Sequence, residues 1–330
     1  MYLGAEGDTA DEIKKVFQLD VKPKSEAIME YSNWRHSFNP LAAVTLNSAC
    51  SLFVASDINI LPDYLQQSSD IFGSLPYTVD FANSSATSHL INDWVANNTN
   101  DKITQLIDQT DGNMKVMLLS AIYFKGSWKF PFESKLTRKD EFYIPQETGV
   151  NRTVQVDMMS RKGRHRLNRI EKLDAMSLEL PYNNSNLSMV ILLPRSVDGI
   201  KKIIANLDQM DINEIAPKSY EMQVKIDLPK FKFDVNLELK DALKSLGLVE
   251  LFSRANLSDM TDSKADIQIN NVRQRAVIQV DEEGSKDPQE IKFSYINFPM
   301  VETDVRINHP FIFIIKDDDT VYLAGRVTME

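Results

Sequence analysis

Apolar and polar positions along the chain follow two different periods. Residues 116–124 and 188–194 are almost continuously apolar, which is typical of strands buried on both faces. Residues 44–54 partly alternate and carry β-branched side chains, so we predict a strand there as well. Further strands are predicted at 274–280, 311–315 and 321–327.

Three segments have the features of helices. Residues 9–17 begin with a threonine and early acids and end in lysines, an order that suits the helix dipole. Residues 88–95 place Leu90, Ile91 and Trp94 on one face, and residues 237–247 are amphipathic and end in glycine. Because helices and strands are interleaved without a repeat or a linker, we predict one α+β domain over residues 1–330.

Composition is that of a globular protein, with 43% hydrophobic and 25% charged residues. The net charge of −10 opposes binding to nucleic acid and to anionic lipid, and no apolar stretch is long enough to span a bilayer. We therefore expect neither partner. The single cysteine, Cys50, excludes an internal disulfide framework, and we interpret it as a buried core residue of the strand at 44–54.

Sequence signals for catalysis are scarce. The chain has no Gly-x-Ser-x-Gly turn, no His-Glu-x-x-His pair and no phosphate-binding glycine loop. The four histidines are scattered, and none has metal-ligand spacing with a cysteine or another histidine. We predict no catalytic residue, no metal and no cofactor, so the protein is not expected to be an enzyme.

Six Asn-x-Ser/Thr triplets are acceptors for N-glycosylation in secreted proteins. They begin at Asn83, Asn97, Asn151, Asn183, Asn186 and Asn256. We expect an extracellular glycoprotein, although no signal peptide is visible at Met1 and chance occurrence of the triplets is the alternative.

Ordered motifs along the whole chain resemble the serpin family. They include the turn at 2–9, Asn92-Asp93-Trp94 with Thr99, the strand at 121–128 ending in Trp128, Pro229-Lys230-Phe231, and Asn308-His309-Pro310-Phe311. Any one of these motifs is weak, but their order and spacing together are specific. The family makes its first helices before the point that matches Met1, so we expect a front segment to be missing from this sequence.

The resemblance implies three β-sheets, eight or nine helices and an exposed reactive loop, here within residues 284–305. In inhibitory serpins a serine protease cleaves this loop and becomes an acyl-enzyme. The front half of the loop then inserts into the main sheet and the protease is distorted. The resemblance also implies an ion pair between Glu282 and Lys230 at the top of this sheet, with the indole of Trp128 beneath it.

The hinge of this loop departs from the family pattern of small residues. After Glu282 and Glu283, Gly284 and Ser285 fit the pattern. The five residues that do not fit are Lys286, Asp287, Pro288, Gln289 and Glu290. Burying an unpaired charge in a central strand costs several kcal/mol, and proline cannot donate its ladder hydrogen bond. We predict that insertion is slow or absent.

Two further departures lie where the main sheet opens in the family. Ser120 stands where an asparagine is usual, and Gln274 stands where a histidine is usual. Harmless local repacking is the alternative interpretation of both.

The centre of the loop indicates how a protease would meet it. The scissile position falls near Ile296-Asn297-Phe298-Pro299, where Pro299 makes the preceding bond a poor one for serine proteases. The apolar Ile296 and Phe298 would suit papain-like cysteine proteases.

We predict a monomeric protein that binds a serine or papain-like cysteine protease and blocks it reversibly. The alternative is a non-inhibitory carrier, chaperone or storage scaffold, and a weaker one is a conventional trap that tolerates this hinge. The basic run at 161–166 is more typical of a solvated strand edge than of a polyanion site.

Overall fold

The computed structural model describes residues 1–19, 22–37, 44–216, 220–263, 267–282 and 303–329. The strands form three sheets, two of five strands and one of four, with helices interleaved between them along the chain. The predicted α+β class with three sheets is therefore confirmed. Contacts divide the chain into two compact units, each assembled from separate segments.

The first unit comprises Met1–Pro40, Leu46–Phe124 and Phe233–Ile278. Its five-stranded sheet has the order β10-β11-β3-β1-β2. The bounds are β10 Phe231–Glu238, β11 Ile269–Val280, β3 Val116–Gly126, β1 Val44–Ala55 and β2 Tyr77–Val79. β11 and β3 are parallel, with register pairs from Ile269↔Val116 to Ile278↔Phe124. We call the boundary between these two neighbouring strands the β3–β11 seam.

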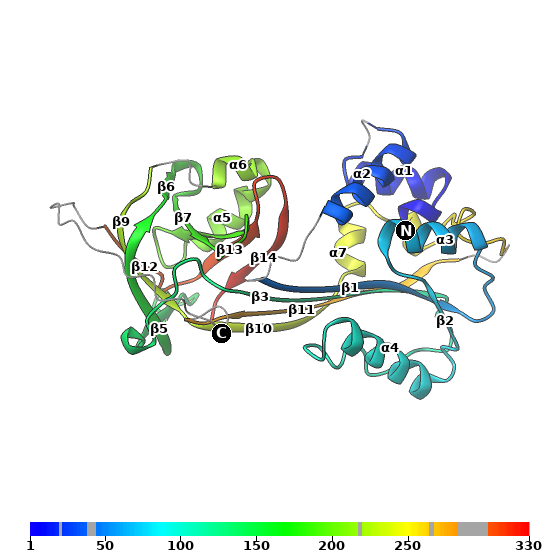
Figure 1. The fold of residues 1–330 in the computed structure, drawn as a ribbon, viewed down its shortest axis with the longest axis horizontal. Coiled ribbons are helices and arrows are strands. Elements are labelled where there is room, and N and C mark those ends of the chain that lie inside the picture. The colour runs from blue at the N-terminus through cyan, green and yellow to red at the C-terminus, as the bar shows by residue number, and fades with distance from the viewer. Residues whose placement is uncertain (20–21, 38–43, 217–219, 264–266, 283–302, 330) are drawn as a thin grey trace. The chain divides into compact units, whose positions relative to one another are not determined.

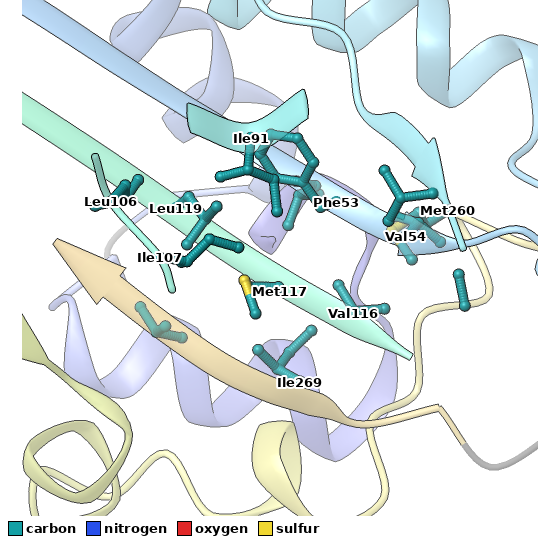
Figure 2. Close-up of a cluster of buried hydrophobic side chains, with 14 of the residues drawn as sticks. Phe53, Val54, Ile91, Leu106, Ile107, Val116, Met117, Leu119, Met260 and Ile269 are labelled. Atoms are coloured by element: carbon teal, nitrogen blue, oxygen red, sulfur yellow. The ribbon is translucent and has the colours of Figure 1, made fainter. Parts of the chain in front are cut away.

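Helices cover both faces of this sheet. α4 (Ser84–Asn98) lies on one face, opposite α1 (Gly7–Val16), α2 (Lys24–Ser37), α3 (Pro62–Phe72) and α7 (Lys240–Ser245), as Figure 1 shows. The short 3-10 helices η1 (Tyr2–Gly4) and η5 (Glu250–Phe252) complete the unit. Its core contains Phe53, Ile91 and Leu119, which are all fully buried (Figure 2).

The second unit comprises Leu41–Thr45, Lys125–Lys232 and Gln279–Glu330 and contains two sheets. One sheet is β12 (Thr303–Arg306), β9 (Met222–Pro229), β5 (Arg152–His165) and β4 (Arg138–Ile144), in that order. The other is β14 (Val321–Val327), β13 (Phe311–Lys316), β8 (Ser188–Pro194), β7 (Ala175–Pro181) and β6 (Leu167–Ile170). The helices are η2 (Ser134–Leu136), η3 (Glu171–Leu173), α5 (Ile200–Asn206), η4 (Leu207–Gln209) and α6 (Ile212–Ile215).

Two predictions about local structure were wrong. The helix expected over 237–247 is confined to Lys240–Ser245, because Leu237 and Glu238 extend β10 instead. Cys50 is exposed although it lies in a strand. Its neighbour Ala49 is buried, and because side chains alternate along β1, Cys50 points to the opposite face of the sheet from Ala49.

Candidate functional site

The candidate site is the start of the predicted loop, directly after β11. We call Asp281 and Glu282 the root of the loop. Asp281 and Glu282 are the last two residues described before residue 283. Both belong to the second unit, as do all the residues that hold them.

Asp281 is held through both its main chain and its side chain. The indole Nε1 of Trp128 donates to the Asp281 carbonyl oxygen over 2.9 Å. One carboxylate oxygen lies 3.1 Å from Lys125 Nζ and 2.9 Å from Gln279 Nε2. The chain direction at the start of the loop is therefore set by three side-chain donors.

Glu282 is only 7% exposed, so its carboxylate is a buried charge. Its Oε1 lies 2.6 Å from Lys230 Nζ and accepts a 2.7 Å hydrogen bond from Thr137 Oγ1. Its carbonyl oxygen accepts from the Phe132 amide over 2.9 Å. Burial by itself would raise the pKa of Glu282, but the bonds from Lys230 and Thr137 outweigh burial, and the pKa is lowered.

Aromatic packing fixes the indole that supports this site. The ring of Trp128 stacks on Tyr182 with centroids 4.8 Å apart and meets Phe132 edge-on at 6.3 Å. Trp128 is 4% exposed. A buried ring in two aromatic contacts has little freedom, so its N–H is held in place for the Asp281 carbonyl.

A cavity of ≈ 490 Å³ opens beside the root. Its lining includes Lys230, Phe231 and Lys232 at the start of β10, and Asp281 and Glu282 from the root. The root therefore borders this cavity and also contacts the buried indole of Trp128.

The strand that follows the loop is anchored by a second set of charges. β12 begins at Thr303 and pairs in parallel with β9. Arg306 forms an ion pair with Asp140, and Arg138 Nη2 lies 2.9 Å from the carboxylate of Asp227. Asp227 is buried, which favours the neutral acid, but hydrogen bonds from Arg138 and Ser160 outweigh this and lower its pKa.

The residues predicted from the sequence fall into three places. Lys230, Glu282 and Trp128 come together at the root. Ser120 and Gln274 lie in the first unit, where they are direct register partners across the β3–β11 seam, and both are half-buried. Their part in any sheet opening stays a prediction.

The remaining predicted residues lie outside the described part of the chain. They are the hinge residues Glu283, Gly284, Ser285, Lys286, Asp287, Pro288, Gln289 and Glu290, and the loop residues Ile296, Asn297, Phe298 and Pro299.

Sequence reasoning missed the partners that hold the root and the far strand. Lys125, Thr137 and Phe132 contact Asp281 or Glu282 from positions about 150 residues earlier in the chain. Lys125 lies in the strand motif at 121–128, and this motif was the one sequence signal that could have pointed to it. In the basic run, Arg161 is half-buried, His165 is buried and Arg164 is exposed, because side chains alternate along β5.

Among the described residues no group of three His, Cys, Asp or Glu could hold a metal ion. Within the same residues, no helix has the length and apolar character needed to cross a membrane.

Comparisons with known proteins agree with the fold described above. The family described as serpin (serine protease inhibitor) matches residues 1–329. The chain is 32% identical over 331 residues to serine protease inhibitor 42Dd of Drosophila melanogaster, covering 99% of this chain and 87% of that protein. It is 29% identical to alaserpin of Manduca sexta, covering 98% of this chain and 83% of that protein.

The crystal structure of Serpin48, described as a highly specific serpin in the insect Tenebrio molitor, superimposes with a TM-score of 0.85. That structure is 29% identical, and the match covers 99% of this chain and 86% of the solved chain. The three-sheet arrangement described above is thus also seen in solved structures.

Proposed function

This chain belongs to the serpin family, and from that membership we propose that it binds a protease through its loop and blocks it reversibly. Serpins are mostly protease inhibitors rather than enzymes, and the relatives named as inhibitors support a protease as the partner. The finer proposal is that blockade occurs without the covalent trap that depends on loop insertion.

The observation that carries this proposal is the chemistry of the hinge. Lys286, Asp287 and Glu290 are ionised at neutral pH, and Pro288 has no amide hydrogen. In a strand, alternate side chains share a face, so either register places at least one of these charges on each face. An inserted central strand would have to bury one of them or neutralise it, by protonating a carboxylate or deprotonating the lysine.

The anchored root supports the same proposal. Glu282 immediately precedes these residues and is held by Lys230, Thr137 and the Phe132 amide. β12 is held at the other end by the pair of Arg306 with Asp140. Both attachment points of the loop are therefore fixed, and any freedom already removed before a protease binds raises affinity without a covalent step.

The apolar loop residues Ile296 and Phe298 suit the hydrophobic pocket of a papain-like cysteine protease. Pro299 makes the bond before it a poor one for serine proteases. We propose that a protease of the papain-like class is blocked at least as well as one of the serine class.

Incubation with one protease of each class tests the mechanism. We expect lost protease activity, no adduct on a denaturing gel, and recovery of activity on dilution. An adduct that survives SDS would show covalent trapping and overturn the proposal. No effect on any protease would favour a carrier, chaperone or storage scaffold instead.

We further propose an extracellular, glycosylated monomer. Five of the six triplet asparagines, Asn83, Asn97, Asn151, Asn186 and Asn256, are exposed. Asn83 also caps α4 by accepting from the Ala86 amide. Expression in a secreting eukaryotic cell should give a mass that falls after N-glycosidase treatment, and light scattering should give the mass of one chain.

A further inference from the structure

One arginine of the basic run at 161–166 faces inward. Arg161 lies on β5 and is half-buried, whereas Arg164 lies on the opposite face of the same strand and is exposed. Nη1 of Arg161 donates a hydrogen bond to the carbonyl oxygen of Phe130. Its Cζ lies 5.2 Å from the ring centroid of Phe130 and 5.9 Å from that of Phe132. Arg161 therefore contacts the 127–133 segment through one hydrogen bond and two cation–π contacts.

The 127–133 segment lies between β3 and η2 and holds the root of the loop. Backbone hydrogen bonds to residues 181–183 fix its first half, at Ser127 and Lys129. In its second half, the Phe132 amide donates to the Glu282 carbonyl oxygen over 2.9 Å, and the Phe132 ring meets Trp128 edge-on. The contacts of Arg161 thus support the half of the segment that binds Glu282.

Glycine at position 163 leaves room for the Arg161 side chain. A Cβ at Gly163 would lie 2.6 Å from Arg161 Nη2 and 3.4 Å from His165 Nε2. Residues 161, 163 and 165 share one face of β5, so the guanidinium lies beside the bare backbone of the glycine. A methyl group at 163 would displace the guanidinium, since the end of a long side chain moves more readily than a strand.

We propose that Arg161 is a positioning residue of the root, which acts through Phe130 and Phe132 on the bond between the Phe132 amide and the Glu282 carbonyl oxygen. Without the guanidinium, the Phe130 carbonyl loses this donor and both rings lose their cation. Residues 130–132 then move more freely, and Glu282 leaves its site more often.

This role goes beyond the proposed function and rests on it only in that a fixed root pre-organises the loop for a protease. The test measures the root itself and needs no target protease, so the two proposals can fail separately.

The experiment measures how often Glu282 leaves its site. A glutamate-specific endoprotease must bind the carboxylate of the residue before the cut bond, and that of Glu282 is held by Lys230 and Thr137. Cleavage after Glu282 therefore requires the root to open, and at low protease concentration its rate follows the population of the open form. Mass spectrometry separates the fragment 1–282 from other products, and cleavage after the exposed Glu147 is the internal reference.

The variants are Arg161→Gln, Gly163→Ala and the double variant. Arg161→Gln should be cleaved after Glu282 about tenfold faster than the wild type, because a hydrogen bond from a charged donor is lost. Gly163→Ala should give about threefold acceleration, since the arginine is displaced but not removed. The double variant should match Arg161→Gln within about twofold, because Gly163→Ala acts through the arginine.

Arg164→Gln is the matched control, because Arg164 lies on the same strand with the same charge but on the opposite face. Ile203→Val controls for general destabilisation. Ile203 is fully buried in a separate core cluster of the second unit, so this variant lowers overall stability without a change at the root. Both variants should be cleaved after Glu282 at a rate within about twofold of the wild type.

Three results would overturn the proposal. They are a wild-type rate of cleavage after Glu282 in Arg161→Gln, equal acceleration in Arg164→Gln or Ile203→Val, and a Gly163→Ala effect that is as large in the double variant as in the wild type. If Arg161→Gln does not fold, Gly163→Ala keeps the arginine and decides the matter, since an unchanged rate in that variant contradicts the proposal. A covalent adduct with a target protease contradicts only the proposed function.

Discussion

Lys230 Nζ lies 2.6 Å from Glu282 Oε1, so the residue that precedes the loop hinge is held by an ion pair whose carboxylate is buried and whose lysine is partly exposed. Lys230 lies directly after β9 and Glu282 two residues after β11. The pair thus joins two strand ends that are about 50 residues apart in sequence. The path of the chain into the loop depends on this contact and on the Trp128 indole beside it.

Glu282→Gln should lower the free energy of unfolding at pH 7 by about 2 kcal/mol, because a hydrogen-bonded charge is lost from a buried site. The lowered pKa of Glu282 gives the sign of the pH dependence. Stability from this carboxylate is present above its unfolded pKa and is lost as the pH falls through the folded pKa. Urea unfolding at pH 7 and pH 3 should therefore show a smaller difference between variant and wild type at pH 3.

The control for this change is Glu133→Gln. Glu133 pairs with Lys135 at 2.7 Å, but both side chains are more than half exposed. Exposed pairs contribute about 0–1 kcal/mol, so the control should be nearly neutral. Equal losses in the two variants would contradict a special role for the root pair.

Trp128→Phe should also destabilise the root, by about 1–3 kcal/mol, because the Asp281 carbonyl loses its indole donor. Trp34→Phe is the comparison, since that side chain is 38% exposed on α2 and its replacement should change stability by about 0.5 kcal/mol or less. Chemical unfolding of both variants checks the prediction, and a neutral Trp128→Phe would mean that the bond to Asp281 carries little energy.

His165 should make the protein less stable in mildly acidic solution. Its ring is 2% exposed, and burial, together with the nearby charge of Arg161, lowers its pKa to about 4. Between pH 6.5 and 4 the unfolded chain binds a proton that the folded chain does not, so stability falls as the pH falls. The full effect is on the order of 3 kcal/mol.

His165→Gln removes the titrating group and should flatten the dependence of the urea midpoint on pH in this window. His89→Gln is the control for replacing a histidine by glutamine, because His89 is exposed on α4. If the urea midpoint of His165→Gln depends on pH as steeply as that of the wild type, other groups cause the acid sensitivity.

Replacing the hinge tests the reason proposed for poor insertion. A variant with Lys286→Thr, Asp287→Ala, Pro288→Ala and Glu290→Ala should insert its loop after cleavage, since the charges and the imino acid are gone. Removing a penalty of several kcal/mol should raise Tm of the cleaved form by about 10 °C or more over cleaved wild type, at roughly 2–4 °C per kcal/mol. Thermal melts before and after nicking of the loop measure this.

A large rise in Tm on cleavage of the wild type itself would show that the native hinge already inserts. A cleaved variant that still fails to gain stability would place the barrier elsewhere in the protein.

The sequence by itself determined the family, the α+β class and the position of the principal strands. The nearly continuous apolar runs of β3 and β8 and the ordered motifs around Trp128 and Lys230 are local signals, because they depend on neighbours along the chain. The charged hinge could likewise be recognised from residue types alone, since the energy of burying a charge does not depend on a particular fold.

Only the tertiary structure decided which distant groups meet. The contact of Arg275 with Gln105 joins residues 170 positions apart, and that of Trp128 with Asp281 joins residues 153 apart. No periodicity encodes such pairings, because they follow from strand order and register. For the same reason Cys50 and Leu237 were misplaced: which face of a strand is covered, and where β10 ends, depends on the elements packed against it.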